Sequence, residues 1–162
     1  MLKLVTLLIA AGALVASATA ADRIHPIQVR GNDTGTFSLA SGPSPTIFFS
    51  TDVSSGVASH LGRYDFVAHE VFDAANNVVT QATFTITTKH GTLYGNYTAT
   101  TGVGATPNIV TYHAPGSITG GTGRYAGASG TIVFDGFGDL QTHMLDDRFA
   151  ANIVLQSDVD DD

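Results

Sequence analysis

The sequence predicts an all-β protein, an eight-stranded antiparallel up-and-down β-barrel, and three observations lead to this prediction. Beyond residue 20, apolar residues tend to recur at every second position, which is the period of a strand with one buried face. No segment there shows a helical period. Turns rich in glycine and asparagine separate the strand-like segments, and closing the sheet into a barrel removes the exposed edges that such strands would otherwise leave.

The clearest strand-like segment covers residues 63–72. One of its faces carries Tyr64, Phe66, Ala68, Glu70 and Phe72. A bulge of one residue would exchange the two faces and turn Asp65 and His69 inward instead. Asn76-Asn77 predicts the turn that follows, because asparagine tolerates left-handed backbone angles.

Other strand-like segments lie on both sides of this one. They cover residues 36–39, 46–51, 83–87, 92–99, 109–114, 118–119, 131–137 and 149–155. Lys89-His90-Gly91 predicts a turn between two of them. Residues 40–55 contain two prolines and several serines, so we expect a long loop there around the short strand 46–51.

The N-terminus is typical of a secretory signal peptide over residues 1–20. Lys3 supplies a positive charge, residues 4–16 are an apolar run, and Ala18-Thr19-Ala20 offers small residues for cleavage. The run is shorter than the roughly 20 residues of a membrane-spanning helix. We therefore expect a secreted protein, extracellular or periplasmic, without membrane attachment after cleavage. A retained N-terminal anchor is the alternative.

One barrel domain is expected over residues 21–157, followed by a solvated acidic tail at residues 158–162. The chain has 14 Asp and Glu against 7 Lys and Arg, and its basic residues are scattered, so nucleic acid is not an expected partner. It has no cysteine, which excludes disulfides and cysteine nucleophiles. Its histidines follow no known ligand spacing, so neither a metal nor a cofactor is expected.

The most distinctive motif covers residues 117–130, Ser-Ile-Thr-Gly-Gly-Thr-Gly-Arg-Tyr-Ala-Gly-Ala-Ser-Gly. Its glycines can take backbone angles that are closed to other residues, which suits a tight connection between strongly curved strands. The arginine would anchor this turn through its side-chain donors. The residues expected to shape the turn are Gly120, Gly121, Gly123, Arg124, Gly127 and Gly130.

This motif resembles the glycine-rich signature shared by plant dirigent proteins and allene oxide cyclases. Residues 56–64, Gly-Val-Ala-Ser-His-Leu-Gly-Arg-Tyr, resemble a second motif of exported bacterial proteins in the same barrel-like superfamily. The resemblance covers residues 56–156. It implies an eight-stranded antiparallel barrel with a central cavity and, by analogy, a homotrimer. The pocket of allene oxide cyclases includes a cysteine, which this chain lacks, so the resemblance carries no catalytic residues.

The residues expected to line the cavity are Tyr64, Phe66, Glu70, Phe72, Tyr97 and His60. Glu70 shares a strand face with aromatic residues, where the loss of hydration would raise its pKa. Tyr97 lies on the apolar face of its own strand and could meet Glu70 inside the barrel. His60 belongs to the second motif, where a hydrogen bond to a neighbouring turn is the simpler role.

These observations predict a non-enzymatic exported barrel that binds a small apolar ligand in its interior. Two alternatives stay open. One is a cyclase, isomerase or dirigent-like enzyme that steers a reactive hydrophobic substrate with Glu70 and Tyr97. The other is a structural protein of the cell surface or the extracellular space.

Overall fold

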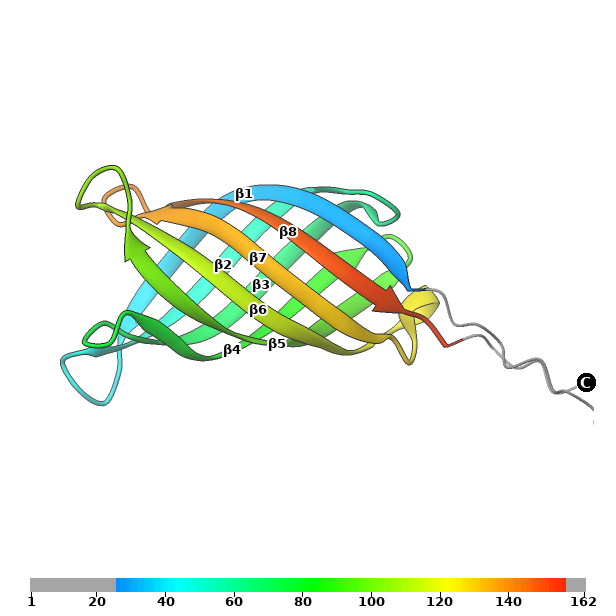
Figure 1. Ribbon diagram of the computed structural model, residues 1–162, viewed down its shortest axis with the longest axis horizontal. Helices are drawn as coiled ribbons and strands as arrows, with labels where there is room; N and C mark the ends of the chain where they lie inside the picture. The colour runs from blue at the N-terminus through cyan, green and yellow to red at the C-terminus, as the bar shows by residue number, and fades with distance from the viewer. Residues whose placement is uncertain (1–25, 157–162) are drawn as a thin grey trace, which may run out of the picture.

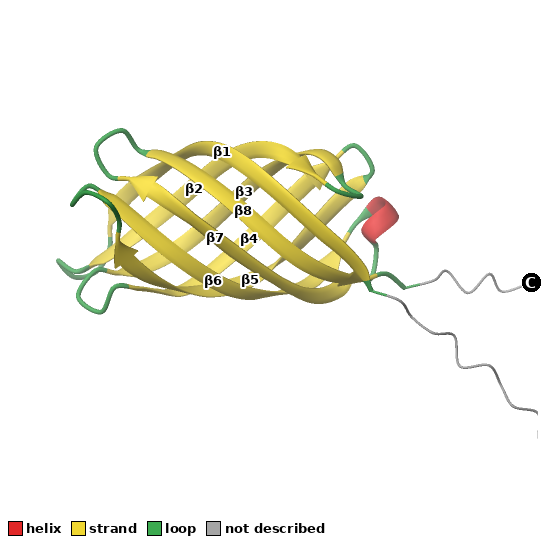
Figure 2. Cartoon of the chain, turned by 45° about the horizontal axis from the view of Figure 1, so that its top comes forward, coloured by secondary structure: helices red, strands yellow, loops and turns green. Residues whose placement is uncertain are grey.

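The computed structural model describes residues 26–156, and the predicted signal peptide and acidic tail lie outside the described residues. Its strands are β1 (Ile27–Ser41), β2 (Ile47–Ala58), β3 (Gly62–Asp73), β4 (Val78–Thr88), β5 (Gly91–Val103), β6 (Ile109–Gly121), β7 (Ser129–Asp139) and β8 (Met144–Val154). Each strand pairs antiparallel with the next, and β8 closes on β1, as Figures 1 and 2 show. The predicted eight-stranded antiparallel up-and-down barrel is confirmed.

A single short 3₁₀ helix, η1 (Gly123–Tyr125), interrupts the strand order of the described part of the chain. Between residues 26 and 156, no helix has both the length and the apolar character needed to cross a membrane.

The two ends of the barrel differ in how their inward-facing side chains meet solvent. At the end where η1 lies beside the start of β1 and the end of β8, Leu61, Tyr125 and Ala128 are buried (Figure 1). We call this the capped end. At the other end, the inward-facing Phe48 and Phe72 are only partly buried. We call it the open end, because its interior side chains are in contact with solvent.

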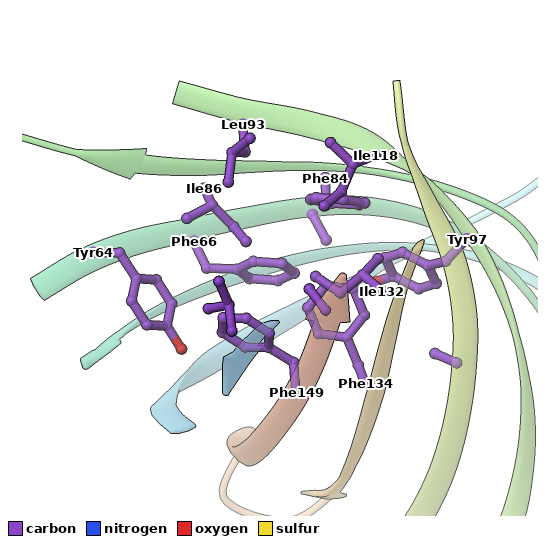
Figure 3. Close-up of a cluster of buried hydrophobic side chains, with 14 of the residues drawn as sticks. Tyr64, Phe66, Phe84, Ile86, Leu93, Tyr97, Ile118, Ile132, Phe134 and Phe149 are labelled. Carbon is purple, nitrogen blue, oxygen red and sulfur yellow. The ribbon is translucent and has the colours of Figure 1, made fainter. Parts of the chain in front are cut away.

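Aromatic rings fill the middle of the barrel (Figure 3). The buried rings are those of Tyr64, Phe66, Phe84, Tyr97, Phe134 and Phe149. Phe134 lies at their centre, with its ring centroid 5.3 Å from that of Phe66 and 5.4 Å from that of Phe84. Glycine makes room for the outer rings, since a Cβ at Gly31 would lie 2.5 Å from the ring of Phe149.

The prediction of a long loop over residues 40–55 is wrong. β1 continues to Ser41 and β2 begins at Ile47, so the connection covers only residues 42–46. The reason is that β2 has no amphipathic pattern: both of its faces mix polar and apolar side chains. Its inward face carries Ser50, Asp52 and Ser54, and its outward face carries Phe49, Val53 and Val57.

The segments expected at residues 109–114 and 118–119 form one continuous strand, β6. Pro115 lies within it, paired with Val133 of β7, while the pairing with β5 is interrupted between His113 and Gly116. Proline lacks the N–H group that a ladder on both sides would require, so the interruption on one side accommodates it.

The glycine motif forms the connection from β6 to β7 at the capped end. Gly123, Gly127 and Gly130 have positive φ angles of 57°, 68° and 150°, which confirms that this connection needs glycine at these positions. Gly120 and Gly121 do not have positive φ angles: they are the last residues of β6, where a Cβ would overlap Tyr94 and Tyr125. The Arg124 side chain is exposed, and its guanidinium makes none of the side-chain hydrogen bonds of the described residues, so the expected anchoring through its side-chain donors is not observed. Its backbone N–H instead donates to the carbonyl oxygen of His90 at 2.9 Å, which ties the connection to the β4–β5 turn.

Gly130→Ala is expected to lower the free energy of unfolding by about 3 kcal/mol. At φ 150° an added Cβ would overlap the carbonyl oxygen of Asn152 on the paired strand. Gly62→Ala is the matched control: Gly62 has φ 75°, but nothing lies within 4 Å of a Cβ there, so about 1 kcal/mol is expected. Urea unfolding followed by circular dichroism measures both values, and equal losses would contradict the steric argument.

Candidate functional site

Four carboxyl side chains face the barrel interior from four neighbouring strands. They are Asp147 on β8, Asp33 on β1, Asp52 on β2 and Glu70 on β3. Asp33 and Asp147 are only 3% and 5% exposed, whereas Asp52 and Glu70 are partly buried towards the open end. We call these four residues the interior acidic cluster. Carboxylates are seldom buried in this way unless a cation accompanies them.

No cationic side chain of the described residues accompanies this cluster. Every lysine, arginine and histidine between residues 26 and 156 is exposed on the outer surface or in a turn. His69 is the one whose charge favours ionisation of Asp52, and it acts from the outer face of the wall. Inside the barrel, the four carboxyls therefore have one another, neutral hydroxyls and aromatic rings as neighbours.

One buried tyrosine reaches a carboxyl across an intervening strand. Tyr64 of β3 pairs with Gly56 of β2, which in turn pairs with Asp33 of β1. Because Gly56 has no side chain, the Tyr64 hydroxyl passes over it and donates to Oδ2 of Asp33 at 2.5 Å.

The same arrangement recurs two strands further on, across β3, β4 and β5. Glu70 of β3 pairs with Ala82 of β4, and Ala82 pairs with Tyr97 of β5. The small side chain of Ala82 lets the Tyr97 hydroxyl donate to Oε1 of Glu70 at 2.5 Å. The sequence predicted that Glu70 and Tyr97 share the interior, and the structure joins them by this hydrogen bond.

Each of these two arrangements is a row of three paired residues on adjacent strands: a tyrosine, a small residue and a carboxyl. A third such row lies on β6, β7 and β8, but it lacks the hydrogen bond. Tyr112 of β6 pairs with Gly136 of β7, and Gly136 pairs with Asp147 of β8. A Cβ at Gly136 would lie 2.8 Å from the Tyr112 hydroxyl and would overlap Oδ1 of Asp147, so both polar atoms lie over this glycine. Among the described residues, Asp147 Oδ1 nevertheless has no hydrogen-bond partner.

Burial raises the pKa of every member of the cluster. It raises the pKa of Asp147 to about 9, with further contributions from the charges of Asp33, Asp52 and Glu70. The pKa of Glu70 rises to about 7 and that of Asp52 to about 6, although hydrogen bonds from Tyr97 and Ser50 oppose the two shifts. Burial also raises the pKa of Asp33. At neutral pH the barrel therefore holds protons on carboxyls that are ionised in the unfolded chain.

The structure brings five of the six sequence-predicted cavity residues into the interior. Tyr64, Phe66 and Tyr97 are buried, and Glu70 and Phe72 are partly buried. His60 does not join them: it is exposed in the β2–β3 turn at the capped end, with φ 63°.

The alternative register for β3 is contradicted, because Asp65 and His69 are both exposed. The ring Nδ1 of His69 lies 3.2 Å from the Thr51 hydroxyl on the outer wall. Glu70 therefore keeps the inward position that alternation predicts.

Sequence reasoning missed Asp33, Asp52, Asp147 and Ser54. A signal existed for Asp147, which alternates with Leu145 and Phe149 on the buried face of β8. No comparable signal marked Asp52, since its strand has no apolar face.

Two open depressions on the outer surface, of about 580 and 880 Å³, are not lined by any member of the interior acidic cluster. Within residues 26–156, no group of three or more His, Cys, Asp or Glu side chains is arranged to hold a metal ion. The acidic cluster is thus spread around the wall rather than gathered at one point.

In comparisons with known proteins, no family model, curated protein or solved structure matches this chain. The class that the structure defines is that of closed, antiparallel, eight-stranded up-and-down barrels, here with carboxyls and tyrosines facing the interior.

Proposed function

We propose that this protein is an exported, non-enzymatic barrel that binds one small, mainly apolar ligand through the open end of its interior. Four buried side-chain oxygens have no hydrogen-bond partner among the described residues: one is the Tyr125 hydroxyl at the capped end, and the other three, which carry the proposal, belong to or lie beside the interior acidic cluster. These three are Oδ1 of Asp33, Oγ of Ser54 and Oδ1 of Asp147. Buried polar atoms nearly always have a partner, and leaving one unsatisfied costs about 1–3 kcal/mol.

The surroundings of these oxygens suit a ligand that is apolar over most of its surface. Phe48 and Phe72 face inward at the open end and are only partly buried, so two aromatic rings are accessible there. Tyr64 and Phe149 lie deeper, with their ring centroids 5.6 Å apart. An apolar body would cover these rings while a polar group satisfies the oxygens.

Two features of the sequence complete the proposal. The pattern of residues 1–20 supports export. The glycine motif of residues 117–130 supports membership of the barrel superfamily that includes allene oxide cyclases and dirigent proteins, and a homotrimer follows by analogy only.

Native mass spectrometry of residues 21–162, purified gently from the exported fraction of the producing cells, is expected to show an added mass that denaturation removes. Ser54→Ala should reduce the occupied fraction several-fold, because it removes one of the three oxygens. Ser55→Ala, on the outer face of the same strand, should leave occupancy unchanged. A bare protein that also takes up nothing from a panel of small apolar compounds would contradict the proposal.

A further inference from the structure

The interior hydroxyls supply donors to three of the four carboxyls. Tyr64 donates to Asp33, Tyr97 donates to Glu70, and Ser50 donates to Asp52 at 2.7 Å. Asp147 receives no hydrogen bond from any described side chain, although the Tyr112 hydroxyl lies over the same glycine. Once the four carboxyls are ionised, they offer eight acceptor oxygens, more than the inward-facing hydroxyls of the described residues can satisfy: those of Ser50, Ser54, Tyr64, Tyr97 and Tyr112.

The acceptors without donors are neighbours. Asp33 and Asp147 pair directly across the β1–β8 ladder, with both side chains facing inward. Directly opposed side chains of an antiparallel pair have Cβ atoms about 4.5–5.5 Å apart, so one donor group can reach both carboxyls.

Ser54 is a further buried polar side chain beside Asp33. It is a neutral side chain, only 4% exposed, and it faces inward from β2, where its partner in the β1 ladder is Gly35. Its hydroxyl is near enough to Asp33 to lower the pKa of that carboxyl, but it makes no hydrogen bond of good geometry within the described residues. Like the two carboxyls, it is a buried polar group that needs a partner.

We propose that the ligand of this barrel is a small organic ammonium ion with an apolar body, whose N–H groups donate to Asp33 and Asp147. This inference rests on the proposed function and adds the chemical class of the ligand. An ammonium group carries three donors and no acceptor, which matches a site with surplus acceptors. Its positive charge replaces the cation that the described interior does not supply, and aromatic rings such as those of Tyr64 and Phe149, which face the same interior, also attract cations.

Other ligand chemistries fit less well. An anion would meet four carboxyls and no cation, and bringing it into the barrel would cost energy. An alcohol supplies one donor and leaves at least one carboxyl oxygen unsatisfied. A metal ion needs several ligands at a common point, which the carboxyls of the described barrel do not provide.

Binding of an ammonium ion should release protons from the interior, so its affinity should rise from pH 6 towards pH 8. Titratable side chains face the interior from β1, β2, β3, β5, β6 and β8: Asp33, Asp52, Tyr64, Glu70, Tyr97, Tyr112 and Asp147. Strands β4 and β7 place no ionisable side chain inward in the described structure, and His69 and Asp146 act on the cluster from the outer face. Ionisation of the carboxyls, favoured at higher pH, increases their attraction for the cation.

The test is isothermal titration calorimetry at pH 8 with two matched series of ligands. One series consists of primary alkyl- and phenylalkylammonium ions of graded chain length, and the other consists of the alcohols with the same carbon skeletons. The best ammonium ion is expected to bind about tenfold or more tightly than its alcohol, because hydrogen bonds from a charged group are the stronger ones. Asp147→Asn and Asp33→Asn should each weaken ammonium binding about tenfold. Asp146→Asn, whose side chain is exposed on the outer face of β8 and whose charge has the smallest of the effects on the pKa of Asp33, should weaken binding far less than Asp147→Asn.

The outcomes separate this inference from the proposed function. If the alcohols bind as tightly as their ammonium partners, the cationic ligand is ruled out while small-ligand binding stands. If Asp146→Asn weakens binding as much as Asp147→Asn, the assignment to the interior carboxyls is overturned. If neither series binds and native mass spectrometry shows a bare protein, the ammonium ligand and the proposed function fall together.

Discussion

Phe134→Ala is expected to lower the free energy of unfolding by about 4 kcal/mol, a large share of the roughly 5–15 kcal/mol that stabilises a typical domain. The ring of Phe134 is in contact with four others, since its centroid lies 5.3–5.9 Å from those of Phe66, Phe84, Tyr97 and Phe149. Truncation removes buried apolar surface and leaves a cavity that the surrounding strands cannot close, because each is fixed by pairing on both sides.

The matched control is Phe137→Ala on the same strand. Phe137 faces outward from β7 and is 42% exposed, so its loss should cost less than about 1 kcal/mol. Urea unfolding followed by fluorescence and circular dichroism measures both changes. If the two variants lost similar stability, the aromatic layer would not be the centre of the core.

The fold could be predicted because most of the wall follows one simple rule. In β3, β4 and β5 the inward positions are largely apolar, with Glu70 as the charged exception, and the outward positions are largely polar, so alternation alone gives both the strands and their buried faces. The rule failed at β2, where serine and aspartate point inward and Phe49 and Val53 point outward. A strand that departs from the usual pattern looks like a loop when only its sequence is read.

The candidate site was predicted only in part, for the same reason. Glu70 stood out because it interrupts an otherwise apolar face. Asp147 has the same setting between Leu145 and Phe149, but it could be recognised only by starting β8 at Met144. Asp52 could not be recognised at all, because neither neighbour on its own face is apolar.

The contacts between these residues depend on register, which the sequence leaves open. Each tyrosine and its carboxyl lie on strands that are not adjacent, and a small residue on the strand between them lets the two side chains meet. In the three rows, the small residue on the middle strand is Gly56, Ala82 and Gly136, respectively. Nothing in the local sequence of a glycine or an alanine shows which side chains pass over it from neighbouring strands.

The free energy of unfolding is expected to increase by on the order of 4 kcal/mol when the pH is lowered from 8 to 5. The folded barrel keeps the pKa values of Asp52, Glu70 and Asp147 near 6, 7 and 9, whereas their ordinary values are 3.8, 4.5 and 3.8. Between the ordinary and the raised pKa the folded state binds more protons than the unfolded chain, so raising the pH through that window destabilises the fold. The stability lost at pH 8 is recovered as the pH falls towards 4. Urea unfolding at several pH values measures the slope.

Asp147→Asn isolates the largest contributor to this slope. An asparagine has a similar shape and no charge, so the variant should be about 2 kcal/mol more stable than the unaltered protein at pH 8 and should show a flatter dependence on pH. Asp146→Asn changes the same net charge on the outer face of β8, and it should leave the slope nearly unchanged. If both variants flattened the slope equally, the effect would come from overall charge rather than from the buried carboxyl.

A more stable Asp147→Asn variant would also bear on why the barrel carries these acids. Apolar side chains could fill the same interior at lower cost, as they do on β4, where Ala82, Phe84 and Ile86 face inward. A cluster that lowers stability at neutral pH is therefore better explained by what it binds than by what it holds together. An ammonium ligand would offset that cost, so the same experiment repeated with the tightest-binding ammonium ion at pH 8 should stabilise the unaltered protein more than Asp147→Asn.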